Sequence, residues 1–284
     1  MIGFAKRNLL VFFKDRTAVF FSMLAVFIIV GLYALFLGDV WVSSFDNFPG
    51  VRFLVDSWLM SGIVAVTSVT STMGAFGTMV EDKARKISKD IVVSPLSRSS
   101  IAGGYILSSY LIGVIMSIVT LALAEVYVVA NGGALLSFPA LLKVLGLILL
   151  SCFMNTSMIF FLTSFFKSLA AFSTASTVIG TLIGFLTGMY VPIGQLPDAV
   201  QWVVKLFPVS HSVTLFKQVM MEAPMAAAFA SAPAEIAQKF KEAMGVVLKY
   251  GEAEATAAFS LACIALTAVV FSALSVYRMA KKTD

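Results

Sequence analysis

Few side chains in this 284-residue sequence could do chemistry, and they are far apart along the chain. The single histidine, His211, has no cysteine or carboxylate at ligand spacing, and Cys152 and Cys263 lie in separate apolar runs. The sequence contains neither a Ser-His-Asp arrangement nor the phosphate-binding pattern G-x-x-x-x-G-K-[ST]. We therefore expect that the chain alone is not an enzyme and holds no metal or cofactor of its own.

The densest polar segment is residues 81–100, EDKARKISKDIVVSPLSRSS, in which eight of twenty residues are charged. Its first half is typical of a short helix, and Pro95 disfavours helix at the residue before it. One of the serines that follow, Ser97, Ser99 or Ser100, could cap the next helix. A short helix between two apolar runs is a surface that a separate motor protein could grip. The alternative is a solvated loop.

Hydroxyl groups cluster in two of the apolar runs. Such groups can bond back to their own helix, so they indicate either helix packing or a polar-tolerant path for a substrate. A run of glycines, four residues apart, predicts a close helix contact on one face of the later run. The candidates for the path are Thr67, Thr70, Ser71, Thr174, Thr177 and Thr181, and those for packing are Gly180, Gly184 and Gly188.

Glu125 is the only carboxylate well inside an apolar run, near its outer end. An interfacial position explains it better than a proton relay. A pump driven by protons or sodium usually buries several such groups.

The elements that carry these residues are membrane helices. Mean hydropathy is +0.97, and only 12% of residues are charged, against about 25% in a soluble domain. Because a span needs about 20 apolar residues, we predict an all-helical, six-span integral membrane protein with a single transmembrane domain over residues 1–284. An interfacial helix at 1–16 precedes the first span. The predicted spans are 17–37, 57–80, 101–130, 139–166, 168–192 and 255–279.

Lys and Arg indicate the orientation. With six spans and both termini inside, 13 of the 20 Lys and Arg residues lie in inner segments. The positive-inside rule therefore places residues 81–100 and both termini on the cytoplasmic side of the membrane. This bias also explains the net charge of +5, so no nucleic-acid partner is indicated.

The longest segment without a span is residues 193–254, on the outer side. Its first part is apolar but broken by prolines, which favours two short re-entrant helices. Its second part is typical of an amphipathic surface helix. The apolar residues at helical spacing are Ile236, Phe240, Met244, Val247 and Leu248.

Two stretches together resemble the permease subunits of ABC-2 type transporters, the membrane halves of ATP-binding cassette exporters. The first, EDKARKISKDIVVSPLSRSSIAGGYILSSYLIG, follows the second expected span. The second, MYVPIGQLPDAVQWVVKLFPVSHSVTLFKQVM, follows the fifth. The resemblance runs nearly from end to end. Two positions depart from it: Lys86 stands where the family often has glycine, and Tyr105 where a lysine is common.

The resemblance implies an exporter, and the family often moves drugs, lipids or polysaccharides. An apolar, weakly charged path suits an amphiphilic or hydrophobic cargo, such as a drug, an antibiotic or a lipid-like molecule, and a polysaccharide or a peptide is the alternative. It implies a homodimer or heterodimer of permeases, in contact with membrane lipids, and two separate ABC ATPase subunits that bind ATP and Mg²⁺. A secondary transporter or channel not powered by ATP, and a membrane enzyme acting on lipids, are the alternatives. The residues implied in coupling to the ATPase are Glu81, Asp82, Arg85, Ile91, Val93, Pro95 and Arg98.

Overall fold

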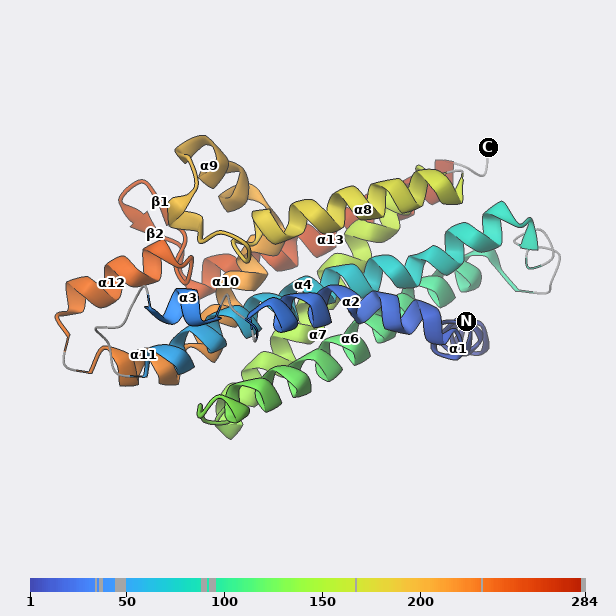
Figure 1. Cartoon of the computed structure of the whole chain (residues 1–284). Coiled ribbons are helices and arrows are strands. Elements are labelled where there is room, and N and C mark those ends of the chain that lie inside the picture. Colours follow the sequence, from blue (N-terminus) through green and yellow to red (C-terminus); the bar gives the residue numbers. More distant parts are fainter. Residues whose placement is uncertain are drawn as a thin grey trace.

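The computed structural model describes residues 1–33, 35, 38–43, 50–87, 91, 96–166, 168–230 and 232–281. It is an elongated bundle of helices with one two-stranded hairpin (Figure 1), which confirms the expected all-helical membrane class. The elements are α1 (Ile2–Lys14), α2 (Arg16–Leu32), α3 (Gly38–Ser43), α4 (Val51–Ala84), α6 (Arg98–Ala130), α7 (Phe138–Thr163), α8 (Leu169–Leu186), η2 (Ile193–Gln195), α9 (Asp198–Leu206), α10 (Pro208–Met220), α11 (Glu222–Ala228), α12 (Ala234–Ala243), β1 (Lys249–Tyr250), β2 (Ala253–Glu254) and α13 (Ala257–Lys281).

Helix α4 is the central element of the bundle. It packs against α2, α6, α7, α8 and α10, and 89% of its span window is buried. The corresponding share is 17% in α8 and in α13, so these two helices lie at the periphery. Trp58 and Phe76 are the largest fully buried apolar side chains of α4. A helix surrounded on all sides is apolar all round, which is why its sequence shows little amphipathic pattern.

Among the described residues, five helices are long and apolar enough to cross a membrane: α4, α6, α7, α8 and α13. A sixth span results only if α1 and α2 are counted together across a bend of 72°. The expected first span therefore corresponds to the 17 residues of α2. The expected fifth span is too long, because α8 ends at Leu186 and a turn follows. The second expected span lies within α4, which extends six residues beyond its start and four beyond its end.

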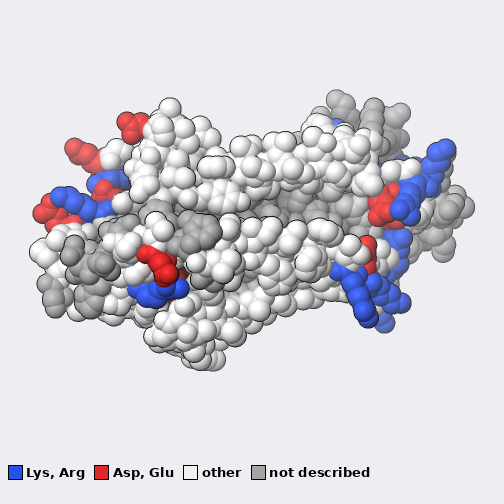
Figure 2. All heavy atoms as spheres, viewed as in Figure 1, with Lys and Arg blue, Asp and Glu red and all other residues white. Residues whose placement is uncertain are grey.

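Charges gather at the two ends of the bundle and leave an uncharged belt between them (Figure 2). Lys and Arg dominate at the end formed by α1, the end of α4 and the start of α6, where the end of α13 also lies (Figure 1). The opposite end, formed by α9–α12 and the hairpin, carries both signs of charge. The uncharged belt is the part that a bilayer would cover.

Serine residues cap the N-termini of three of the long helices. Ser97, one of the expected capping residues, accepts a hydrogen bond from the backbone N–H of Ser100 at 3.2 Å. Ser137 and Ser168 accept in the same way from Ala140 and Ala171. Each cap satisfies a backbone N–H that has no partner inside its helix.

The outer segment contains the two short helices expected after the fifth span, α9 and α10. Helix α10 is inserted among α4, α7 and α13, and most of its side chains are buried. The amphipathic helix is shorter than expected, because α12 ends at Ala243 and Gly245 turns the chain with φ of 66°. Val247 and Leu248 therefore lie beyond it, and the hairpin that follows was not expected.

Candidate functional site

Asp82, in the last turn of α4, is a buried carboxylate that joins three helices. Arg7 of α1 donates two hydrogen bonds to it, from Nη1 to Oδ2 at 2.6 Å and from Nη2 to Oδ1 at 3.1 Å. The Tyr105 hydroxyl of α6 donates a third to Oδ2, also at 2.6 Å. The Asp82 side chain is 4% exposed, and its hydrogen bond raises the pKa of Arg7. A bidentate pair between two ions is among the strongest hydrogen-bonded contacts.

Aromatic packing presses α1 against α6 beside this pair. The Phe4 ring meets the Tyr105 ring edge to face, with centroids 4.9 Å apart. Two glycines allow the close approach, because a Cβ at Gly104 would lie 2.6 Å from Phe4 Cδ1 and one at Gly103 would lie 2.9 Å from Met1 Sδ. Helix α1 is therefore held to α4 by charge and to α6 by packing. We call the cluster of Arg7, Asp82, Tyr105 and Phe4 the coupling hub.

The residues implied in coupling to an ATPase differ in accessibility. Glu81 and Arg85 form an exposed i,i+4 ion pair at 2.7 Å. Arg98 is exposed and Ile91 is half-buried, whereas Val93 and Pro95 lie outside the described residues. Asp82 must be corrected from a docking residue to a helix-joining one, because its carboxylate is enclosed and bonded within the chain.

Lys86 follows α4 with φ of 64°, the one positive φ among the described non-glycine residues. Side chains are strained in this left-handed region, and glycine is not. The departure noted in the sequence, lysine where related chains often have glycine, therefore falls on a turn that favours glycine. At the other departure, the Tyr105 hydroxyl donates a hydrogen bond to Asp82.

A groove of about 520 Å³ runs between α4 and α8 and reaches α1 and α2. Hydroxyl and apolar side chains both line it. The lining residues are Phe12, Phe21, Ser22, Val69, Thr70, Met73, Gly74, Phe172, Ser173, Ser176, Thr177, Ile179 and Gly180.

The groove brings together only part of the expected path. Thr70 and Thr177 line it from opposite helices. Thr67 and Ser71 are fully buried and do not line the groove, and Thr174 and Thr181 are exposed on α8 outside its lining. Thr67, Thr70, Thr177 and Thr181 each donate to a carbonyl of their own helix, as the packing alternative requires.

The three glycines do not form one helical face. Gly188 lies past the end of α8 with φ of 65°, so its inclusion in a packing stripe is wrong. A Cβ on Gly184 would lie 2.1 Å from Cε2 of Tyr190, so its close neighbour is a ring of the turn after α8. A Cβ on Gly180 would meet nothing within 4 Å, although the residue lines the groove.

Lys217 of α10 holds the outer segment to the bundle. Its side chain is fully buried, and Nζ donates to the carbonyl of Met244 at 3.0 Å while lying 5.0 Å from the Trp58 ring centroid. Trp58 Nε1 donates to the same carbonyl at 2.8 Å. Burial lowers the pKa of Lys217 to about 7. His211 in the same helix is buried too, within reach of Ser260 Oγ at 3.1 Å.

Asp56 is a second buried acid that the sequence patterns did not single out. It lies near the N-terminal end of α4, and its Oδ2 accepts a hydrogen bond from Arg52 Nε at 3.2 Å. Arg52 also donates to Asp39 of α3 at 2.7 Å and to Asn131 after α6 at 3.1 Å. This cluster joins α3, α4 and α6 as the coupling hub joins α1, α4 and α6.

The cysteine and acidic side chains of the described residues lie too far apart to form a metal site. Cys152 and Cys263 are both free thiols. Across the described part of the chain, no three His, Cys, Asp or Glu side chains are grouped to hold a metal ion.

Comparison with known proteins places the chain in a family. Residues 42–277 match the family described as ABC-2 family transporter protein. Nodulation protein J of Sinorhizobium fredii (strain NBRC 101917 / NGR234) is 28% identical over 183 residues, or 64% of this chain and 66% of the relative. Nodulation protein J of Rhizobium meliloti (strain 1021) is 26% identical over 176 residues, or 62% of this chain and 65% of the relative. The matched part thus spans just under two thirds of each relative. Because the family match covers most of its length, the chain belongs to the ABC-2 transporter family of membrane proteins.

Proposed function

We propose that the chain is the permease subunit of an ATP-driven exporter in the cytoplasmic membrane, with both termini on the cytoplasmic side. A separate ABC ATPase supplies the energy, and the cargo is an amphiphilic or hydrophobic molecule. The observation that carries the proposal is the coupling hub, which lies beside segment 81–98 at the Lys/Arg-rich end of a chain of this family.

The coupling hub connects helix ends so that a force applied to α4 and α6 also reaches α1. An ATPase that pushes on the exposed Glu81, Arg85 or Arg98 pushes on the ends of α4 and α6. The contacts of Asp82 with Arg7 and Tyr105 make α1 follow the same movement. Since α4 is packed against eight other helices, a shift at its end is passed to the whole bundle.

The groove between α4 and α8 has the lining expected of a substrate path. The exposed face of α8 has the residues expected of a contact with a second permease subunit. Val178, Leu182 and Phe185 are 46–51% exposed on α8. Thr174 and Thr181 are exposed on the same helix. Hydroxyls are poor groups to present to lipid, so a second copy of this chain or a homologous permease covers this helix. The path then lies between the copies, lined by hydroxyl and apolar groups that suit an amphiphile.

The test is ATP-driven transport in inverted membrane vesicles that hold the chain and an ABC ATPase. The ATPase is a candidate ABC ATPase from the same organism, and the cargo is a fluorescent amphiphile. We expect accumulation that needs ATP, the ATPase and the chain together. A matched variant, Thr177→Val, keeps the side-chain shape and removes the groove hydroxyl, and it should change the rate for polar cargo more than ATP hydrolysis. Transport by the chain alone, driven by an ion gradient, would refute the proposal.

A further inference from the structure

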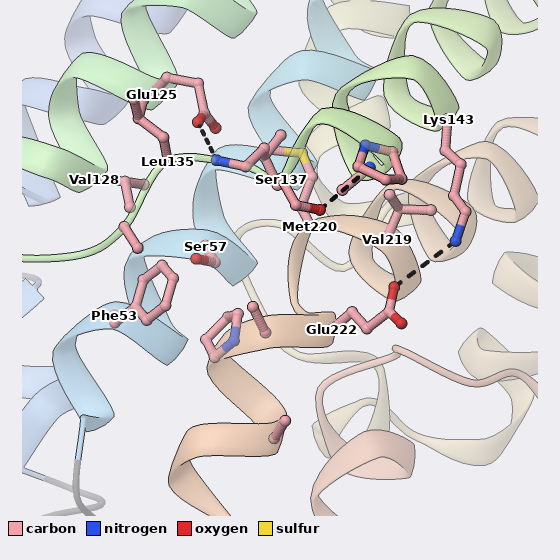
Figure 3. Close-up of a pocket in the computed structure, with 17 residues that line it drawn as sticks. Phe53, Ser57, Glu125, Val128, Leu135, Ser137, Lys143, Val219, Met220 and Glu222 are labelled. Carbon is pink, nitrogen blue, oxygen red and sulfur yellow. Dashed lines mark hydrogen bonds and ion pairs between the residues drawn. The ribbon is translucent and has the colours of Figure 1, made fainter.

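A pocket of about 340 Å³ lies at the outer end of the bundle, away from the groove between α4 and α8. It is enclosed by α4, α6, the start of α7, α10 and α11 (Figure 3). Most of its walls are apolar, including Val128, Leu135 and Met220. A pocket of this size holds a small ligand or the head of a larger one.

The pocket contains one carboxylate that no basic group of the described residues pairs with. Of its charged lining residues, Lys143 and Glu222 face each other at the rim with Nζ and Oε2 3.9 Å apart (Figure 3). Glu125 lies deeper, half-buried, and no described basic group pairs with it. Its Oε2 accepts one hydrogen bond from the backbone N–H of Leu136 at 2.8 Å, which leaves Oε1 for another donor.

A second polar group in the pocket also lacks a partner. Ser57 is 3% exposed and lines the pocket, and its hydroxyl makes no hydrogen bond to another described residue. A hydroxyl that lines a cavity can bond to a ligand or to water in that cavity. Phe53, one turn earlier on α4, lies beside Ser57 in the pocket wall and offers an aromatic ring to a cation (Figure 3).

We propose that this pocket binds the primary ammonium group of an amphiphile. The ammonium donates to Glu125 Oε1 and to the Ser57 hydroxyl, near the face of Phe53, and the apolar body of the ligand lies along the pocket walls. The α6–α7 connection forms part of the pocket wall, and it lies at the end of the bundle where we expect the outer lipid headgroups, so the ligand is one that reaches the membrane surface. The proposal does not depend on the ATPase.

The probe is octylamine, titrated calorimetrically into the full chain in phosphatidylcholine nanodiscs, with empty nanodiscs as the blank. We expect one saturable site. Octanol has the same tail without the charge, and octyltrimethylammonium has the charge without N–H donors, so both should bind more weakly. Signal equal for octanol and octylamine would mean simple partitioning and would overturn the proposal.

Two variants locate the site. Glu125→Gln removes the charge and should weaken octylamine binding about tenfold or more, the expected size for a charge-assisted contact. Ala226→Phe fills the pocket from α11 and should block binding with every charge intact. Glu252→Gln, an exposed acid in the hairpin turn at the same end, is the matched control and should bind as the parent does. If Glu125→Gln does not fold, Ala226→Phe decides; parental binding by a folded Glu125→Gln or by Ala226→Phe overturns the proposal.

A lipid headgroup and a free amine are two sources of the same ammonium. Native mass spectrometry of chain released from equal amounts of phosphatidylethanolamine and phosphatidylcholine separates them. Selective retention of phosphatidylethanolamine by the parent and by Glu252→Gln, lost in Glu125→Gln, assigns the site to a lipid whose phosphate can reach Lys143. Octylamine binding without such retention assigns it to a soluble amphiphilic amine.

Discussion

Replacing Asp82 with alanine should release α1 from the bundle. The change removes the acceptor of three hydrogen bonds, two from Arg7 and one from Tyr105. Breaking one side of a buried ion pair costs about 3–5 kcal/mol when the remaining charge stays buried. The Arg7 side chain is 37% exposed and can regain water, so a cost of about 2–3 kcal/mol is expected.

Two assays test this expectation: one measures the loss of stability and the other the position of α1. On the scale of domains of 150–250 residues, 2–3 kcal/mol lowers the midpoint of thermal unfolding by about 4–12 °C. The position of α1 is measured with cysteines at Phe4 and Gly104, because a Cβ on residue 104 would lie 3.3 Å from the Phe4 Cβ, close to disulfide geometry. Cys152 and Cys263 are replaced by alanine in all variants. The cysteines introduced at positions 4 and 104 should then form a disulfide readily when Asp82 is present and slowly in Asp82→Ala.

The matched control is Glu81→Ala, which removes an exposed acid one position away and should cost at most about 1 kcal/mol. Arg7→Met should cost less when Asp82 is already alanine, since both changes break the same contact. Equal costs for Asp82→Ala and Glu81→Ala, or full additivity of the Asp82 and Arg7 changes, would refute the coupling hub.

Three further changes probe the turn after α4, the end of α8 and the outer segment. Lys86→Gly relieves a left-handed backbone and should raise unfolding stability by about 1 kcal/mol in a thermal melt; a lower melting temperature would contradict this. Gly184→Leu collides with the Tyr190 ring and should cost about 1–3 kcal/mol, less in a Tyr190→Ala background; an unchanged cost there would locate the collision elsewhere. Because burial lowers the pKa of Lys217 to about 7, the unfolded chain binds more protons above pH 7, so the melting temperature should rise between pH 7 and 9 and Lys217→Met should flatten that rise. An equal rise in Lys217→Met would rule Lys217 out as the cause.

The long helices could be predicted because a span is a property of a contiguous run. Apolar length and charge content alone located α4, α6, α7 and α13 within a few residues. The end of α8 could not be located in the same way, because Thr187 and Met189 are compatible with a span. The stop depends on Gly188 adopting a positive φ against Ile193, a contact that hydropathy does not encode.

The coupling hub could not be predicted because its members are distant in sequence. Arg7 and Asp82 are 75 residues apart, and each alone is typical of a solvated charge at a helix end. The hydroxyl clusters were visible in the sequence, but which hydroxyl faces the groove depends on the rotation of α4 and α8 about their axes. That rotation separates Thr70 from Thr67 although both lie in one run.

The central claim is that segment 81–98 contacts the ATPase and transmits its force. The most direct measurement replaces residues 91–93 with Gly-Ser-Gly and compares ATPase binding, ATP hydrolysis and ATP-driven transport in proteoliposomes holding both proteins. The same replacement of residues 282–284, beyond α13, serves as the matched control. We predict normal membrane insertion for both variants, with reduced ATPase binding or hydrolysis uncoupled from transport only in the first. Binding, hydrolysis and transport at parental levels in the 91–93 variant would contradict the account.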